Sequence, residues 1–487
     1  MSTITSHNPR TGEQVGSVPV TGHSEVADAV ARARKAFREW HALDIEERLA
    51  HIRGLKGTLR RNADRIVEVV VCETGKHPSD AMLADVAPAL AVADYYIRRA
   101  VRILSPRRAS SRPLFTKRAW VEYHPLGVAG VISPWNYPFL LPFNPTVMAL
   151  TAGCTVVLKP SEVTPLSGAL VQELANEAGL PSGTVQVVHG TADTAGALID
   201  AADVVSFTGS SQTARKVAAQ AAKTLTPVIL ELGGKDAMVV LEDADLRRAA
   251  RAATWGGLTN AGQTCIAVER LYVVDEAYDR FVTMLAEQVG KLTVGSNDAR
   301  DIGPITTPQQ MEIIERHITD AVDKGARILV GGKRSDQTGS FFEPTILVDV
   351  DHTMDIMREE TFGPVLPVMK VPTAEAALEL ANDSAYGLHG SVWTRDRSRG
   401  RSLASAMETG TVAVNDCLVN YGIPDLPFGG IKDSGYGSSN GPEGLRAFTY
   451  PKAITDSRIR PKRELWWFPR RGGRRLWRWV LRLVGGR

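Results

Sequence analysis

The chain has 487 residues, of which 44% are apolar and 23% charged, and its formal net charge is +3 at pH 7. This length and composition predict large buried cores and two or three domains. The N-terminus lacks the apolar region of a signal peptide, and no run of about 18 uncharged apolar residues predicts a transmembrane helix. Four scattered cysteines without paired spacing indicate a reducing compartment, so we expect a cytoplasmic protein.

The first part of the chain predicts short strands followed by helices. Residues 1–22 are typical of strands around the turn NPRTGE, and a long helical region follows from about 24 to 100, interrupted at Gly75 and Pro78. Residues 102–118 have the Pro, Ser and Arg content of a surface connection. The run AWVEYHPLG at 119–127 then predicts a strand.

From residue 127 the pattern becomes regular. Short β-branched runs, GVAGVIS, TVVLK, VQVVH, DVVSF and PVILE, alternate with helical segments near 138–152, 166–178, 192–200 and 210–222. Such alternation predicts a parallel, doubly wound sheet that binds a nucleotide beyond the carboxyl ends of its strands. Asn136, Lys159, Gly209 and Glu231 would all lie there.

The usual dinucleotide fingerprint G-x-G-x-x-G is missing after these strands. The sequence FTGSSQTA offers a substitute, because Gly209 and Ser210 would stand at a helix N-terminus whose free amides can hold a pyrophosphate. Taken alone, Gly-Ser is also a common turn and helix cap.

A second α/β unit is predicted after residue 236. Its expected strands are AMVVL, RLYVV, ARILVGG, VLPVMKV, HGSVWT and TVAVN, with helices near 245–260, 276–291, 309–324, 373–383 and 396–406. The ten histidines and four cysteines form no ligand-spaced cluster, so no metal is expected.

Glu231 and Cys265 are the candidate catalytic pair at the junction of the two units. A cysteine nucleophile needs a nearby base or a favourable electrostatic site, and Glu231 could be that base. Gly233 and Gly234 allow a tight turn after the strand VILEL, and a helix could then return Cys265 to Glu231. A buried core cysteine is the alternative reading of Cys265 alone.

Together these stretches resemble the aldehyde dehydrogenase superfamily. The motifs ELGGK and GQTC are accompanied, in the order and spacing of the family, by SPWNYP, KPSE, FTGS, EETFGPV and PFGG. The resemblance implies a cofactor domain with a doubly wound parallel sheet, an α/β catalytic domain and a β oligomerisation arm. It assigns 1–112 and 127–233 to the NAD-binding domain, 234–432 to the catalytic domain, and 113–126 and 433–457 to the arm and bridging segment. The composition of residues 458–487 marks them as a separate basic tail.

The resemblance also implies the site residues and their roles. Cys265 would attack an aldehyde, Asn136 and the Cys265 backbone N–H would stabilise the oxyanion, and Glu231 would activate the water that hydrolyses a thioester. Phe428 would line the substrate cleft. The cofactor would be NAD, because a carboxylate at Glu162 disfavours the 2′-phosphate of NADP. The implied cofactor-binding residues are Ser133, Trp135, Lys159, Ser161, Glu162, Gly209, Ser210, Leu232, Glu360 and Phe362.

The substrate is less well defined by the sequence. Residues 137–152 should form a helix along the substrate tunnel and contain no Lys or Arg, which favours an uncharged aliphatic or other lipophilic aldehyde. Relatives that oxidise succinate semialdehyde carry an arginine where this chain has Asn144. Succinate-semialdehyde dehydrogenase nevertheless stays an alternative, because the run RRAVRILSPRRA and the basic tail are similar to bacterial semialdehyde dehydrogenases. A CoA-acylating enzyme is disfavoured by Glu231, and an inactive scaffold by the presence of Cys265 and Asn136.

The C-terminal tail predicts a membrane-surface anchor. Residues 458–487 contain eleven Lys or Arg, one Glu and four of the nine tryptophans. On a helix, Arg471, Arg475, Arg478 and Arg482 share one face, opposite Leu476, Val480, Leu483 and Val484. This segregation is typical of a helix in the headgroup plane of an anionic membrane. The alternatives are a nucleic-acid arm, which the apolar face disfavours, and packing on another subunit of the expected homodimer or homotetramer.

Overall fold

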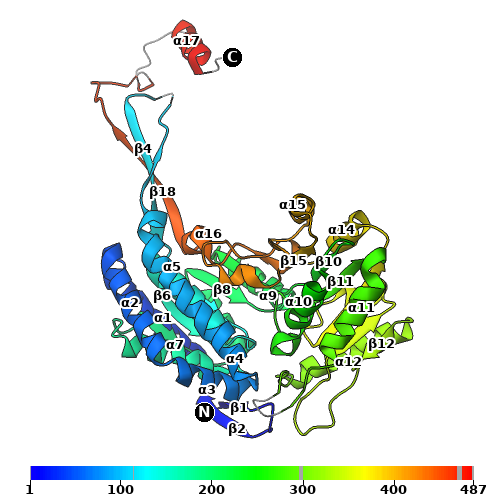
Figure 1. The fold of residues 1–487 in the computed structure, drawn as a ribbon. Coiled ribbons are helices and arrows are strands. Elements are labelled where there is room, and N and C mark those ends of the chain that lie inside the picture. Colours follow the sequence, from blue (N-terminus) through cyan, green and yellow to red (C-terminus); the bar gives the residue numbers. More distant parts are fainter. Residues whose placement is uncertain (1, 113, 296–299, 465, 469–473, 485–487) are drawn as a thin grey trace.

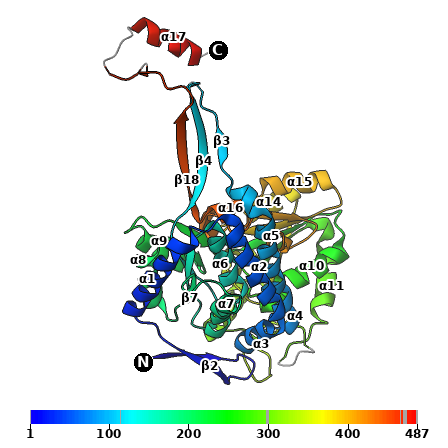
Figure 2. The same cartoon turned by 90° about the vertical axis from the view of Figure 1, so that its left-hand side faces the viewer.

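The computed structural model describes residues 2–112, 114–295, 300–464, 466–468 and 474–484. Its body consists of two α/β units side by side, from which a long β arm projects (Figures 1 and 2). The strands are β1 Thr3–His7, β2 Gln14–Pro19, β3 Arg107–Ala109, β4 Lys117–Pro125, β5 Val128–Ile132, β6 Thr155–Lys159, β7 Val185–Val187, β8 Val204–Thr208, β9 Val228–Glu231, β10 Asp236–Val240, β11 Val268–Val274, β12 Arg327–Val330, β13 Thr345–Val348, β14 Val365–Val371, β15 His389–Trp393, β16 Thr411–Val414, β17 Gly435–Tyr436 and β18 Thr449–Ser457.

Helices surround both units of the body. The α-helices are α1 His23–Trp40, α2 Ile45–Arg61, α3 Ala63–Thr74, α4 Pro78–Ala81, α5 Ala87–Leu104, α6 Leu140–Ala152, α7 Pro165–Glu177, α8 Ala192–Ala201, α9 Ser211–Ala221, α10 Leu246–Leu258, α11 Asp275–Val289, α12 Pro308–Asp323, α13 Asp355–Arg358, α14 Ala374–Asn382, α15 Arg397–Ala406, α16 Gly441–Arg446 and α17 Arg474–Val484. A π-helical turn, η1 Met82–Val86, joins α4 to α5, and the 3₁₀ turns are η2 Thr259–Gly262, η3 Val419–Gly422 and η4 Lys432–Ser434.

The first unit contains the expected doubly wound sheet. Its strand order is β17-β9-β8-β5-β6-β7, in which β5 to β9 are parallel and β17 runs antiparallel to β9. Helices α6 and α7 pack on it together with α1, α8 and α9, and the strands are almost continuously apolar and buried. Burial on both faces is what such runs predict, so this part of the fold prediction is confirmed.

The second unit is a seven-stranded sheet of order β12-β13-β14-β11-β10-β15-β16. All pairs are parallel except β12 with β13, and β13 was not foreseen from the sequence. Helices α10, α11, α14 and α15 pack against this sheet around a large apolar core. The predicted domain boundaries stay predictions; β17, from the expected bridging segment, pairs with the first sheet.

The arm is a three-stranded antiparallel sheet of order β18-β4-β3. The sequence predicted a surface connection over 102–118, but α5 extends to Leu104 and β3 pairs with β4. β4 and β18 pair with each other within the chain over nine residues each. Beyond the tip of the arm lies α17, which begins at Arg474 (Figures 1 and 2). Arg471 of the predicted basic face lies outside the described residues. No helix among the described residues is long and apolar enough to cross a membrane.

Candidate active site

Cys265 lies between the two units, in the loop from η2 to β11. It is partly exposed and lines two cavities, of about 430 Å³ and about 240 Å³. The approach to Cys265 is strained, since Asn260 and Ala261 adopt positive φ angles of 51° and 55°. A Cβ on Gly234 would come within 2.8 Å of the Cys265 carbonyl oxygen, so this glycine allows the two loops to meet.

The smaller cavity brings together most of the predicted site residues. Its lining includes the three catalytic candidates Asn136, Glu231 and Cys265. From the predicted cofactor set it includes Trp135, Gly209, Ser210, Leu232, Glu360 and Phe362. Ser133, Lys159, Ser161 and Glu162 are not part of this lining; they lie at the ends of β5 and β6, where the Ser133 N–H donates to the Lys159 carbonyl at 3.2 Å. Thr208, Gly233, Gln310 and Ile313 also line it and were not foreseen.

Glu231 is the last residue of β9 and is buried. Its Oε1 accepts a hydrogen bond from Ser439 Oγ at 3.0 Å, whereas Oε2 has no hydrogen-bond partner among the described residues. Burial raises the pKa of Glu231 to about 8, and the Ser439 hydrogen bonds oppose this rise. A carboxyl group with this pKa can exchange a proton near neutral pH, as a general base must.

The electrostatic surroundings of Cys265 do not favour its thiolate form. Burial, followed by the nearby carboxylates Asp236, Glu360 and Glu231, raises the pKa of the Cys265 thiol. The thiol is therefore protonated at rest, and thiolate formation requires a base. Glu231 has one free carboxylate oxygen and lines the same cavity.

Asn136 is held by a buried ion pair that sequence reasoning missed. Lys76 Nζ donates to the Asn136 backbone carbonyl at 2.6 Å and lies 3.0 Å from Asp85 Oδ2. Asp85 Oδ1 in turn accepts from two amides at the start of α6. The Asn136 side-chain Nδ2 donates to the Gln263 carbonyl at 3.1 Å, and its second N–H is available to an oxyanion. Lys76 follows directly after Gly75, where the sequence showed only a helix break.

A second buried ion pair positions Glu360 and Phe362. Lys235 Nζ lies 2.6 Å from Glu269 Oε2, and Glu269 accepts the backbone N–H groups of Thr361 and Phe362 at 2.8 Å each. Phe362 has a positive φ of 50° and its ring packs edge-on against Trp135, at 5.6 Å between centroids. These contacts fix both aromatic rings at the smaller cavity.

The lining of the smaller cavity fits the nicotinamide and pyrophosphate part of a dinucleotide, and the residues expected at the adenosine half lie outside this lining. Helix α9 begins beside it, with Ser210 as its N-cap, so free amides face the cavity beside Gly209. The buried Ser133 Oγ finds no hydrogen-bond partner among the described residues. Near the expected ribose site, Lys159 Nζ lies 3.2 Å from the half-exposed carboxylate of Glu162.

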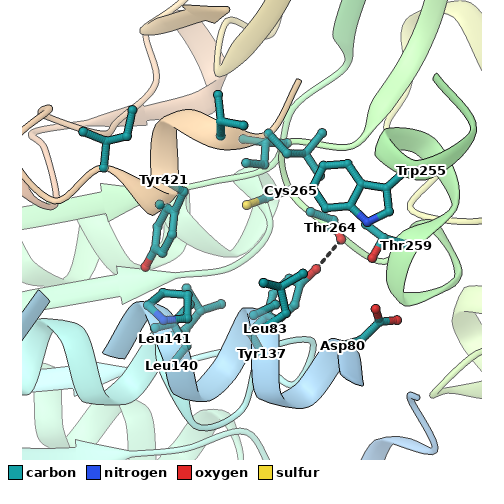
Figure 3. Close-up of a pocket in the computed structure, with 17 residues that line it drawn as sticks. Asp80, Leu83, Tyr137, Leu140, Leu141, Trp255, Thr259, Thr264, Cys265 and Tyr421 are labelled. Atoms are coloured by element: carbon teal, nitrogen blue, oxygen red, sulfur yellow. Dashed lines mark hydrogen bonds between the residues drawn. The ribbon is translucent and has the colours of Figure 1, made fainter. Parts of the chain in front are cut away.

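The larger cavity is mostly apolar and has Cys265 in its wall (Figure 3). It is lined by Asp80, Leu83, Ala84, Pro88, Tyr137, Leu140, Leu141, Trp255, Thr259, Thr264, Cys265, Ile266, Leu418, Val419, Tyr421, Gly422 and Ile423. No Lys or Arg is among them, and Asp80 is the single charged residue of this lining. We call this cavity the tunnel.

Two polar groups of the tunnel wall are already paired. Tyr137 OH lies 2.6 Å from Thr264 Oγ1, and Asn144 Nδ2 donates to Tyr421 OH at 3.0 Å. Phe428, expected to line the cleft, is not part of either cavity lining; it is buried at 4.8 Å between ring centroids from Tyr421, in an apolar cluster against which Cys265 also packs. The polar atoms of the wall are thus turned toward protein partners.

Comparison with known proteins gives consistent matches over most of the chain. The profile described as "Aldehyde dehydrogenase family" matches residues 1–454. A 4,4'-diapolycopene aldehyde oxidase from Methylomonas sp is 43% identical, covering 96% of this chain and 88% of that protein. A succinate-semialdehyde dehydrogenase [NADP(+)] from Escherichia coli (strain K12) is 36% identical, covering 91% of this chain and 92% of that protein. The crystal structure of a Mycobacterium tuberculosis aldehyde dehydrogenase complexed with NAD+ superposes with a TM-score of 0.89, at 38% identity over 93% and 94%.

Proposed function

Because the chain belongs to the aldehyde dehydrogenase family, as its profile match and relatives establish, we propose that it oxidises a lipophilic aldehyde to the carboxylic acid with NAD. It is an oxidoreductase that acts on aldehydes with a nicotinamide cofactor. We propose the roles of the catalytic residues, the lipophilic character of the aldehyde substrate and a preference for NAD over NADP. The observation that carries this proposal is the largely apolar tunnel, without a Lys or Arg in its lining, that has Cys265 in its wall.

The reaction begins with proton removal from Cys265. Glu231 takes this proton, and the sulfur attacks the aldehyde carbon to form a thiohemiacetal. The free N–H of the Asn136 amide and the backbone N–H of Cys265 stabilise the oxyanion. A nicotinamide cofactor held by Trp135, Glu360 and Phe362 would supply the hydride acceptor, and loss of hydride from this carbon would leave a thioester on Cys265. Glu231 releases the Cys265 proton to solvent and, as a carboxylate again, deprotonates a water molecule that hydrolyses the thioester; the acid leaves and Cys265 is restored.

The residues predicted to hold NAD fall into two groups. Trp135, Leu232, Glu360 and Phe362 would surround the nicotinamide half, and Gly209 and Ser210 the pyrophosphate. Ser133, Lys159, Ser161 and Glu162 would contact the adenosine half. A carboxylate at Glu162 would accept a hydrogen bond from the ribose of NAD and repel the 2′-phosphate of NADP.

The tunnel lining favours a lipophilic aldehyde over a dicarboxylic semialdehyde. A second carboxylate would enter an apolar cavity without a Lys or Arg to pair with, at a cost of several kcal/mol. The Escherichia coli relative named for succinate semialdehyde keeps that substrate as the second candidate. The Methylomonas relative, named as a 4,4'-diapolycopene aldehyde oxidase, supports the first.

The tail is proposed to bind an anionic membrane surface at the inner face of the cell membrane. Arg475, Arg478 and Arg482 share one face of α17, and Trp477 and Trp479 are exposed on the same helix. Basic residues at such a surface contribute ~1 kcal/mol each. Deleting 460–487 should release the protein from anionic liposomes and preserve oxidation of short aldehydes. Failure of the intact chain to co-sediment at low salt would leave subunit packing as the role of the tail.

The function is tested with the purified chain, NAD and a panel of straight-chain aldehydes with succinate semialdehyde. We expect NADH and free acid without CoA, with kcat/KM rising with chain length. A higher kcat/KM for succinate semialdehyde would favour the second candidate, and strict dependence on CoA would exclude hydrolysis.

A further inference from the structure

The entrance of the tunnel is surrounded by exposed apolar side chains. Leu83, Trp255 and Ile423 line the tunnel and are 58%, 44% and 45% exposed. Met82, Val419 and Leu426 are exposed beside them on η1, η3 and the loop after η3. We call these residues the mouth patch: Met82, Leu83, Trp255, Val419, Ile423 and Leu426. Four of them line the tunnel, Met82 and Leu426 lie close to these in sequence, and exposed apolar side chains gathered around an opening are typical of an interaction surface.

Basic side chains flank the mouth patch on both sides. A hollow that shares Trp255 with the tunnel is lined by Arg251, Lys291 and Arg300. Another hollow, which shares Ile423 with the tunnel, is lined by Arg98 and Arg99. Acidic residues also line these hollows, namely Asp80 and Asp301 in the first and Asp94 and Asp425 in the second.

The acidic groups of the hollows are held by internal contacts. Asp301 accepts from Thr293, Asp94 pairs with Lys56 and Arg98, and Asp425 accepts from Tyr95 OH. Asp80 accepts the Asn260 N–H. In contrast, Arg99, Arg251 and Lys291 have no carboxylate within ion-pair distance among the described residues, so their charges face outward beside the patch.

We infer that the mouth patch and its basic flanks dock on an anionic lipid surface, so that the tunnel opens directly into the membrane. This inference rests on the proposed oxidation of a lipophilic aldehyde. Apolar side chains would enter the acyl boundary while Arg99, Arg251 and Lys291 contact headgroup phosphates, and Trp255 lies where aromatic residues favour the interface. The substrate would then pass from lipid to the apolar tunnel without crossing water.

Two observations favour lipid over a second copy of the chain. Residues of the mouth patch and Cys265 line the same tunnel, so a second subunit bound to the patch would close the tunnel. A symmetric contact would also bring the same basic flanks together. The tail does not replace this contact, because α17 lies beyond the arm, far from the body that holds the tunnel (Figures 1 and 2).

The test compares full-length variants on two forms of substrate. The mouth variant combines Met82→Ser, Leu426→Ser, Arg251→Glu and Lys291→Glu, none of which lies in the proposed catalytic or cofactor site. Its matched control combines Lys35→Glu and Arg38→Glu on α1, both exposed. Propanal in solution measures the chemical steps, and a long-chain aldehyde in phosphatidylglycerol-containing vesicles measures delivery from lipid.

We expect the mouth variant to keep the parent kcat/KM for propanal within about twofold and to lose at least tenfold for the vesicle-borne aldehyde, whereas the control loses neither. Hydrogen exchange of the parent with vesicles should slow at 78–86 and 419–426. Parent-like oxidation of the vesicle-borne aldehyde by the mouth variant would overturn the inference. So would a lower oligomer mass of this variant in light scattering, which would make the patch a subunit interface. Loss of propanal oxidation by the parent would instead contradict the proposed function.

Discussion

Lys76 Nζ lies 2.6 Å from the backbone carbonyl oxygen of Asn136, and both residues are buried. The same ammonium group pairs with Asp85, so one ion pair joins the π-helical turn before α5 to the loop that carries the oxyanion candidate. This contact positions Asn136 from behind, on the side away from the cavity.

Lys76→Met should lower kcat more than it raises KM. Misplacement of Asn136 by even an ångström is expected to reduce kcat on the order of tenfold to a hundredfold. The substitution also leaves Asp85 unpaired, which should cost about 3–5 kcal/mol of folding free energy. The double variant Lys76→Met/Asp85→Asn removes the unpaired charge. Recovery of thermal stability without recovery of kcat would identify a positioning role; recovery of both would reduce Lys76 to a structural residue.

Cys265→Ser should abolish turnover, whereas Glu231→Gln should block hydrolysis after acyl transfer. In Glu231→Gln, stopped-flow absorbance should show a single burst of NADH close to one per active site and almost no steady state; the burst should form more slowly than in the parent, because Glu231 also takes the proton of Cys265. Ser439→Ala is a useful comparison because it removes a contact to Glu231 but keeps the carboxyl group. Normal steady-state turnover of Glu231→Gln would mean that another base acts.

The pKa of Glu231, raised to about 8 by burial, predicts a pH profile for hydrolysis of the acyl-enzyme. The basic form increases as pH rises, so the rate should increase about tenfold per pH unit below 8 and level off above it. Rapid-quench measurement of deacylation between pH 6 and pH 9.5 checks this. Mass spectrometry of the acyl-enzyme formed by Glu231→Gln should show slow hydrolysis without that rise.

The raised pKa of Glu231 also makes the stability of the fold depend on pH. Whereas the rate of hydrolysis rises with pH, the stability contribution of Glu231 falls. The folded protein holds the Glu231 proton from its ordinary pKa of 4.5 up to about 8, so the contribution of this group to stability falls as pH rises through that window. The melting temperature of Glu231→Gln, minus that of the parent, should therefore increase from pH 5 to pH 9. A difference that stays constant with pH would contradict the assigned pKa.

The sequence predicted most strands because their side chains are buried on both faces and read as continuous apolar runs. It missed β13 and β3, the first because TILV is a short run before an irregular loop, the second because its residues are Arg-rich and lie on an exposed arm. Phe428 was placed at the cleft by resemblance, but the direction of a side chain depends on tertiary packing against Tyr421. Lys76, Asp85, Lys235 and Glu269 were missed because buried ion pairs between distant segments leave no periodic signal.

Glu162→Gln should increase the use of NADP. Removing this half-exposed carboxylate removes its repulsion of a 2′-phosphate, which at such a site is worth about 1 kcal/mol, or roughly fivefold in KM for NADP. Glu173→Gln, an exposed carboxylate on α7 that pairs with Arg65, is the matched control. An unchanged ratio of kcat/KM between NAD and NADP would show that Glu162 does not select the cofactor.

The arm should assemble the protein into a dimer or tetramer. A three-stranded sheet that projects from the body without a covering layer buries little apolar surface. Phe115, in the connection from β3 to β4, and Tyr450, on β18, are 71% and 45% exposed. Because β4 and β18 already pair within the chain, a partner would meet the faces or outer edges of this sheet.

Light scattering at micromolar concentration should give a multiple of 52.7 kDa. Phe115→Glu/Tyr450→Glu should lower this mass toward one chain, because paired charges in the interface would be desolvated without partners. Leu225→Glu, at an exposed position on the body, should leave the mass unchanged; a parent chain that scatters as a monomer would remove the arm from assembly altogether.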